Sequence, residues 1–188
     1  MNKYNSKKTS LFYYQTAYNW LPIFKTIPIL TGHEYPTSIR GLNFMDEKLA
    51  NLFFTLACSR IAYWLWRVEG DGFHLTNNFL MSLPFQPNVF TKNNKKTLEE
   101  LGTTFWESIQ GSTLISNNSD KLTLNYCPHG YGNILDKIDT IILDAYDINP
   151  EFLNFLKEFL MDTIIVDRYD EPKYQTTMQL IIQGETIT

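Results

Sequence analysis

The stretch SRIAYWLWRVEGDGFHLTNNFLMSLPF, residues 59–85 of this 188-residue chain, carries the main structural and functional signals of the sequence. It starts inside an apolar helical pattern, passes through the turn sequence EGDG, and ends on the apolar residues LPF. A glycine-containing turn between two apolar segments is typical of a loop held on a packed scaffold. Side chains suited to stacking and to hydrogen bonding lie within it: Trp64, Trp66, Arg67, His74, Asn77 and Asn78.

One helix that is apolar on nearly all sides is predicted before this turn. Asp46 can accept hydrogen bonds from the first helical N–H groups, and Gly70 can end the helix. Apolar residues recur at helical spacing, and only Asn51, Thr55 and Ser59 form a narrow polar stripe. We therefore expect this helix at the centre of its domain.

Strand-like and helix-like segments surround the central helix. Aromatic and β-branched residues predict three short strands, over residues 11–20, 23–30 and 38–44. Amphipathic helices are predicted at 76–81, 97–110, 134–146 and after a cap at Asn149. A polar loop over 112–120 should lead to an alternating strand over 121–126. The fold class is thus predicted to be α+β: a small N-terminal β region, a central buried helix, further amphipathic helices with a short strand, and a C-terminal helical pair.

The length and the apolar content predict a single domain over residues 1–188. Hydrophobic residues make up 44% of the chain and aromatic residues 15%, which is enough for a sizeable core. Its expected parts are a strand-rich region (1–46), a helical region (47–111), a loop and strand (112–130), a helical pair (131–170) and a tail (171–188).

Charge and cysteine content exclude several classes of protein. The formal net charge of -4 excludes a globally basic nucleic-acid binder, so phosphate contacts must come from a local patch or a partner. Cys58 and Cys127 lack the spacing of a disulfide framework or a zinc site. The most apolar stretch, 49–66, contains polar residues that suit a buried helix better than a membrane span. The polar N-terminus lacks a signal-peptide core, so we expect a cytoplasmic protein without a membrane partner.

Catalytic motifs are not found in the sequence. It contains no glycine-rich phosphate loop and no recognisable order of Ser, His and Asp or of Cys and His. The acidic pairs at 136/139 and 144/147 have helical spacing and are predicted to lie on the solvent face of an amphipathic helix. A metal-dependent nuclease is therefore the least favoured hypothesis.

The side chains around the EGDG turn suit nucleic-acid recognition. Arginine can bond guanine and asparagine can bond adenine through two hydrogen bonds each, and aromatic rings can stack on an unpaired base. A purely structural interpretation is also open. In it Trp64 and Trp66 belong to the core, Asp71 makes the turn, and Asn77 and Asn78 serve the start of a helix.

Short motifs in a fixed order favour recognition. They are YY at 13–14, Trp20, Ser59 with YW at 63–64, GDGFHLT at 70–76 and LPF at 83–85, followed by KID at 137–139, Tyr146 and EFL at 151–153. Over about residues 10–170 this order resembles the C-terminal target-recognition region of bacterial adenine-N6 DNA methyltransferases of restriction–modification systems (Type II/IIG-like). Members of that family show a Gly/Ser-Asp-Gly turn, a His-Leu/Val-Thr step, a Leu-Pro-Phe close and a closing helical pair.

The resemblance implies a DNA-binding specificity module whose catalytic domain lies elsewhere. That domain would carry the S-adenosylmethionine motif and the Asn-Pro-Pro-Tyr/Phe motif, and neither occurs here, since Asn149-Pro150 is followed by Glu151. We expect no cofactor in this chain and no activity of the chain alone. It would be a C-terminal fragment, a truncated gene product or a subunit of a split enzyme, with double-stranded DNA and a catalytic methyltransferase domain or subunit as partners.

Nine residues are candidates for DNA contacts. Groove or backbone contacts are predicted for Arg40, Asn43, Arg67, His74, Asn77 and Asn78, and further phosphate contacts for Lys7, Lys8 and Lys25. The alternative function, suggested by the acidic balance and the many large apolar residues, is a structural subunit that docks on a catalytic methyltransferase without binding DNA.

Overall fold

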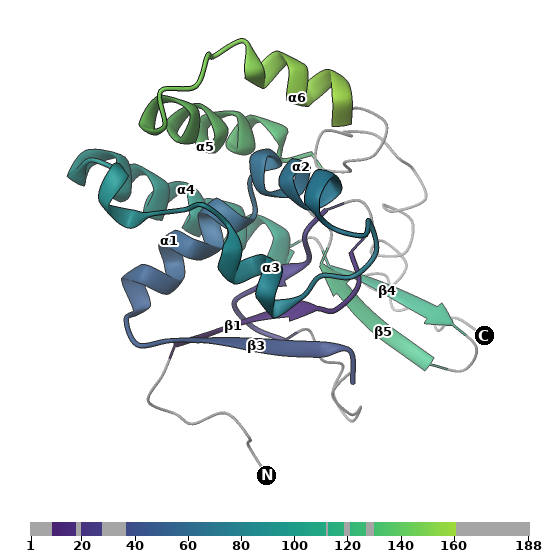
Figure 1. The fold of residues 1–188 in the computed structure, drawn as a ribbon. Helices are drawn as coiled ribbons and strands as arrows, with labels where there is room; N and C mark the ends of the chain where they lie inside the picture. The colour runs from purple at the N-terminus through teal and green to yellow at the C-terminus, as the bar shows by residue number, and fades with distance from the viewer. Residues whose placement is uncertain are drawn as a thin grey trace.

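The computed structural model describes residues 9–17, 20–27, 37–111, 113–118, 121–126 and 130–160. Its strands are β1 (Thr9–Tyr14), β2 (Ile23–Phe24), β3 (Ile39–Phe44), β4 (Thr113–Asn118) and β5 (Lys121–Tyr126). Its helices are α1 (Glu47–Ala57), α2 (Arg60–Glu69), α3 (Asn77–Ser82), the 3-10 turn η1 (Pro87–Val89), α4 (Lys92–Gly111), α5 (Gly132–Ala145) and α6 (Phe152–Leu160). The predicted α+β class is confirmed (Figure 1).

The first three strands form an antiparallel sheet in the order β2-β1-β3. Leu11 pairs with Leu42, and Phe12 pairs with Phe24 on the other side of β1. The strands are shorter than the sequence predicts. After Tyr14 the chain leaves the regular ladder, although the N–H of Gln15 still donates to Ser38 O at 2.9 Å.

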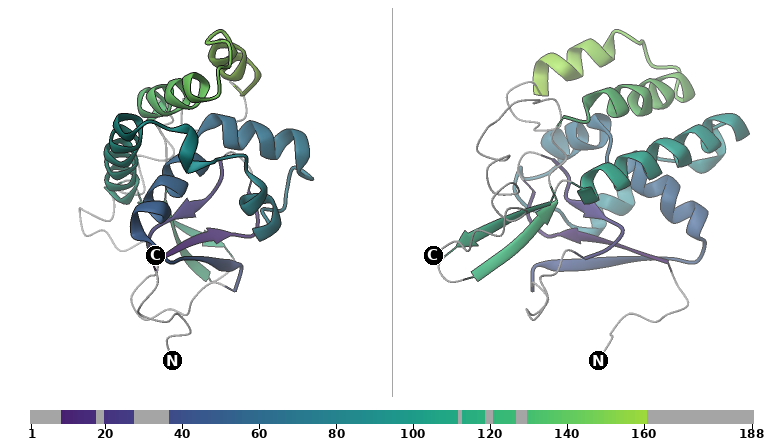
Figure 2. Two further views of the ribbon diagram at one scale, coloured as in Figure 1. Left: turned by 60° about the vertical axis from the view of Figure 1, so that its left-hand side comes forward. Right: turned by 180° about the vertical axis from the view of Figure 1, so that it is seen from behind.

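Helix α1 lies at the centre of the domain, as expected from its apolar sides. It packs against all three strands of this sheet and against α2, α4 and α5. Figure 1 and Figure 2 show the sheet on one side of α1 and the pair α5 and α6 on the other side. Its side chains Ala50, Phe54 and Ala57 are completely buried.

The prediction of one helix from Asp46 to Gly70 is wrong in one respect, because the helix breaks at Cys58 and Ser59. Asp46 caps α1 and Gly70 ends α2 as predicted, but Ser59 begins the new helix α2. The Ser59 hydroxyl accepts a hydrogen bond from the N–H of Ala62 at 3.1 Å. A side-chain cap of this kind satisfies an N–H that has no partner within the helix, so the break does not leave the Ala62 N–H unpaired.

Thr55, the middle residue of the predicted polar stripe, is buried against α4. Thr55 Oγ1 lies 2.9 Å from Asn51 O within its own helix and 3.2 Å from Leu98 O in α4. At Gly102 of α4, an added Cβ would lie 1.9 Å from Thr55 Oγ1. The two helices therefore approach each other at a distance that only glycine allows. Helix α4 also begins earlier than predicted, where Thr91 Oγ1 accepts the N–H of Asn94 at 3.1 Å.

A second correction concerns residues 112–120, which were expected to form a loop. Residues Thr113–Asn118 form β4 and pair with β5 along its length, with Ile115 opposite Leu124. The hairpin is anchored by Tyr126, whose ring lies 5.9 Å from that of Phe24 and 5.1 Å from that of Trp106.

The closing helical pair is present as α5 and α6. Asn149 Oδ1 accepts the N–H of Glu151 at 2.9 Å, which is the predicted cap, and α6 begins at Phe152. Residues 161–188, which include the end of the predicted pair and the predicted tail, lie outside the described residues. Among the helices that are described, none is both long and apolar enough to cross a membrane.

Candidate nucleic-acid interface

Two glycines shape the segment between α2 and α3, residues 70–76, which we call the α2–α3 turn. Gly70 donates its N–H to Trp66 O at 2.9 Å, and an added Cβ there would lie only 2.5 Å from that oxygen. Gly72 has a φ of 75°, in the left-handed region that glycine adopts at little cost. The EGDG sequence therefore ends the helix and reverses the chain direction.

Asp71 organises the turn with a single carboxylate. Its Oδ1 accepts the N–H groups of Phe73 at 2.9 Å and of His74 at 2.6 Å, and its Oδ2 lies 2.5 Å from His74 Nδ1. Hydrogen bonds from the His74 side chain, and then from the two N–H groups, lower the pKa of Asp71 to about 2. The carboxylate is therefore ionised across the physiological range.

The turn is attached to the core and to the continuation of β1. The buried Trp66 donates its indole N–H to His74 O at 2.9 Å. Thr16 and His74 form an isolated antiparallel bridge, flanked by hydrogen bonds from Ala17 N–H to Phe73 O and from Leu75 N–H to Gln15 O. The backbone that carries the His74 ring is thus fixed from two directions.

Arg67 and His74 are brought together on this turn. Arg67 is exposed in the last turn of α2, and its Nη1 lies 3.8 Å from the point where a Cβ on Gly72 would stand. The His74 side chain is 60% exposed, and its Nδ1 faces Asp71. A guanidinium that lies against the turn and an oriented imidazole within it are therefore both exposed to solvent.

Asn77 and Asn78 follow as the first two residues of α3, and both are exposed. The helix cap is Thr76, whose Oγ1 accepts the N–H of Phe79 at 3.1 Å. Since Thr76 provides the cap, neither carboxamide is used for it. Leu80, which is completely buried, fixes the helix to the core.

Arg40 and Asn43, on β3, already have partners within the fold. Arg40 Nη1 donates to Thr37 O at 2.8 Å and to Ile39 O at 3.0 Å. Asn43 Oδ1 accepts the hydroxyl of Ser10 at 2.8 Å. Asn43 lies three positions after Arg40 along the strand, so their Cα atoms are about 10 Å apart. Gln15 donates its N–H to Ser38 O, just before β3, and accepts the N–H of Leu75 in the α2–α3 turn. Arg40 therefore lies at the end of β3 that adjoins this turn, and Asn43 lies nearer the other end.

Of the three lysine candidates, only Lys25 lies among the described residues, and it contacts the core. Lys25 is half-buried, with its Nζ 5.0 Å above the centre of the Phe54 ring, and burial lowers the pKa of its ammonium group. A cation over a core ring of this kind contributes to packing. Lys7 and Lys8 lie outside the described residues.

The structural and the functional interpretations of the 59–85 stretch apply to different residues. Trp66 is a core residue, so its ring is not available for stacking on a base, and Trp64 is half-buried with its ring 5.2 Å from that of Phe152. Asp71 makes the turn, as the structural interpretation states. Arg67, His74, Asn77 and Asn78 remain on the surface.

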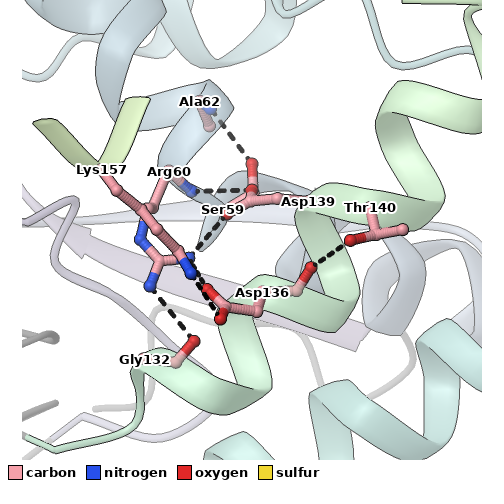
Figure 3. Close-up of polar contacts among 8 residues, drawn as sticks. All are labelled: Ser59, Arg60, Ala62, Gly132, Asp136, Asp139, Thr140 and Lys157. Atoms are coloured by element: carbon pink, nitrogen blue, oxygen red, sulfur yellow. Dashed lines mark hydrogen bonds and ion pairs between the residues drawn. The ribbon is translucent and has the colours of Figure 1, made fainter. Parts of the chain in front are cut away.

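A buried ion cluster around Arg60 was missed by the sequence-based predictions (Figure 3). Arg60 Nη1 lies 2.9 Å from Asp139 Oδ2 and 2.9 Å from Asp136 Oδ1, and Nη2 donates to Gly132 O at 3.1 Å. The Arg60 N–H also donates to Asp139 Oδ1 at 3.1 Å, so this carboxylate caps the start of α2 as well. Lys157 Nζ adds a contact to Asp136 Oδ2 at 2.7 Å.

The predicted solvent position of the acidic pair 136/139 is therefore wrong. Asp139 is fully buried and Asp136 is 32% exposed, whereas Asp144 and Asp147 are exposed as predicted. Burial raises the pKa of Asp139 to about 6, although the Arg60 guanidinium acts in the opposite direction. An arginine inside an apolar helix was the one sequence signal for such a cluster, since a buried cation requires a partner.

No group of three or more potential metal ligands occurs among the residues that the structure describes. Cys58 is a free buried thiol whose pKa is raised by burial, and Cys127 lies outside the described part of the chain. Comparison with protein-family models, with curated proteins and with solved structures gives no match to this chain. Arguments about its function therefore rest on its own residues.

Proposed function

We propose that this chain is a DNA target-recognition module of an adenine-specific DNA methyltransferase from a bacterial restriction–modification system. The observation that carries the proposal is the α2–α3 turn, where Arg67 and His74 are presented together on a fixed backbone. The GDGFHLT sequence of this turn is also the motif on which the family resemblance depends.

The chemistry of these side chains fits contacts with duplex DNA. An exposed guanidinium can bind a phosphate, or can bond the O6 and N7 atoms of guanine through two parallel hydrogen bonds. The carboxamides of Asn77 and Asn78 can bond adenine in the same way. A rigid support matters because a base contact requires the side chain to be held close to its productive geometry.

In this proposal the chain selects the site and another protein domain performs the reaction. A catalytic methyltransferase domain or subunit would bind S-adenosylmethionine and methylate the adenine, and no cofactor is assigned to this chain. A module that acts with such an enzyme on genomic DNA would work in the bacterial cytoplasm.

A salt titration of DNA binding tests the proposal. We expect the purified chain to bind a fluorescent duplex at low salt and to lose affinity as salt increases, because phosphate contacts release counterions. Arg67→Ala combined with His74→Ala should weaken binding, and a lost base contact should reduce discrimination by about 1–3 kcal/mol in the reconstituted enzyme. Lys137→Ala, an exposed cation on α5, is the matched control and should have little effect.

A second candidate function, a structural subunit that docks on a catalytic partner, is favoured by a different observation. Phe152, Phe155 and Phe159 stack along α6 with ring centres 5.3 and 5.6 Å apart, and the last two are 43% and 52% exposed. Exposed aromatic rows are typical of protein-binding surfaces. Absence of DNA binding at low salt, together with a tight complex with a methyltransferase subunit, would favour this function over the first.

A further inference from the structure

The His74 ring is held in one orientation by contacts to its side chain and to its backbone. Asp71 Oδ2 faces Nδ1 at 2.5 Å, and Asp71 Oδ1 accepts the His74 N–H. Trp66 holds the His74 carbonyl, and the edge of the Phe73 ring meets the imidazole at 4.9 Å and 88°. The ring has little freedom to rotate while these contacts persist.

These contacts also determine which ring nitrogen carries the proton. A carboxylate without a proton can only accept, and the pKa of Asp71 is about 2, so Nδ1 must be the nitrogen that donates. The neutral ring then has its lone pair on Nε2, on the side away from Asp71. Nε2 can accept a hydrogen bond as it stands, or it can take up a proton and become a charged donor.

Among the described residues, Asp71 and Arg67 contribute side-chain charges at this turn, and Arg40 lies at the end of β3 that adjoins it. Asp71 lies on the Nδ1 side, and the Arg67 guanidinium from α2 lies across Gly72. Glu69 is exposed at the end of α2. The continuation of β1 contributes Gln15, Thr16 and Ala17, which carry no charge.

We propose that Asp71 is a positioning residue that orients Nε2 of His74 toward DNA, and that His74 takes up one proton from solvent when DNA binds. This inference rests on the proposed DNA-binding function. On protonation the neutral imidazole becomes a cation, and its new Nε2–H donates to an acceptor on DNA. The acceptor is either a phosphate oxygen or the N7 or O6 atom of guanine, because all of these accept hydrogen bonds and carry negative charge or partial charge.

If proton uptake by His74 accompanies DNA binding, DNA affinity must depend on pH. Between about pH 5 and 8, where histidine side chains titrate, affinity should increase as pH falls. The slope should approach about tenfold in Kd per pH unit, because one proton is bound together with DNA. Asp71 stays ionised over this range, but Asp139 titrates within it, so the wild-type profile must be compared with that of a variant.

Two variants isolate the step. His74→Gln cannot take up the proton, so its DNA affinity should lose the part of the slope that His74 supplies. Asp71→Asn retains an oxygen for the N–H groups of Phe73 and His74, but it places an amide donor opposite Nδ1. The proton of the neutral ring should then move to Nε2, which nitrogen NMR of the imidazole detects in the protein without DNA. A merely structural role of Asp71 would leave the tautomer unchanged.

The outcomes separate this inference from the proposed function. Salt-dependent DNA binding with equal pH slopes in wild type and His74→Gln would overturn the inference and leave the proposed function intact. No DNA binding by the wild type at low salt and at any pH would overturn both. Selection from random duplexes then identifies the acceptor: a uniform loss of affinity in His74→Gln indicates a phosphate, and an altered base preference indicates guanine.

Discussion

The α2–α3 turn and the Arg60 cluster each pair an aspartate with a cationic or basic side chain, yet the pKa values of the two aspartates are shifted in opposite directions. Asp71 is exposed and accepts three hydrogen bonds, and its pKa falls to about 2. Asp139 is buried, and its pKa rises to about 6 even though a guanidinium lies 2.9 Å away. Loss of water outweighs the paired charge in the second case, whereas hydrogen bonding decides the first. The buried pair therefore fixes the helices, and the exposed pair orients a side chain at the surface.

Removal of the buried carboxylate should lower the stability of the protein more than any other substitution at these two sites. Asp139→Ala leaves Arg60 in the core without its fully buried partner, and we expect the free energy of unfolding to fall by about 3–5 kcal/mol. Urea denaturation measures this change. Asp144→Ala, an exposed aspartate on the same helix, is the control and should alter stability by no more than about 0.5 kcal/mol. Equal effects of the two substitutions would show that Asp139 is not a structural partner of Arg60.

The pH dependence of stability should show the raised pKa of Asp139. Its carboxyl group has an ordinary pKa of 3.8 when unfolded and about 6 when folded, so between these values the folded state binds more protons. Stability from this group is fully present below the unfolded pKa and is lost as pH rises through the folded pKa, by roughly 2–3 kcal/mol. Denaturation of wild type and of Asp139→Asn at several pH values tests this, and parallel profiles would contradict it.

The outer member of the cluster should matter less than its centre. Lys157 Nζ and Asp136 Oδ2 are 2.7 Å apart, but their side chains are 41% and 32% exposed. Because solvent screens such a pair, Lys157→Ala should cost only about 0.2–1 kcal/mol. Lys157→Met is the matched variant, since it retains the apolar stem and removes only the charge. A loss as large as that of Asp139→Ala would mean that Lys157 is needed to neutralise the whole cluster.

Asp71→Ala should have the smallest effect on global stability and a clear local effect. The amide hydrogens of Phe73 and His74 lose their acceptor and should exchange faster with solvent, while the midpoint of thermal unfolding changes little. Because the folded pKa of Asp71 is lowered, its contribution is present above the unfolded value of 3.8 and is lost as pH falls toward about 2. Unchanged exchange of both amides would contradict the hydrogen-bond pattern at this turn.

Local signals explain most of what the sequence predicts correctly. Asp46, Thr76 and Asn149 are caps within three residues of the N–H groups that they bind, and Gly70 ends a helix at its own position. Such contacts depend on neighbouring residues only, so a single sequence contains the information. The gathering of Arg67 and His74 on one turn follows for the same reason.

Contacts between distant residues account for the errors. Ser59 was assigned to the middle of a helix, because a serine there does not reveal that Asp139 caps the same helix start from 79 residues away. The placement of 136/139 on the solvent face failed for the same reason. The strand β4 was missed because its last residues, Ser116, Asn117 and Asn118, have the composition of a loop and become a strand by pairing with β5.

The bridge between Thr16 and His74 means that the α2–α3 turn would not keep its shape as an isolated peptide. Its shape depends on the glycines and Asp71 within it, but also on three residues that follow β1 and on the indole of Trp66. A synthetic loop with the sequence GDGFHLT, or a shortened chain that begins at α1, would carry the same side chains without that support. Transplantation of the turn into another protein should therefore include a strand in the position of Gln15, Thr16 and Ala17.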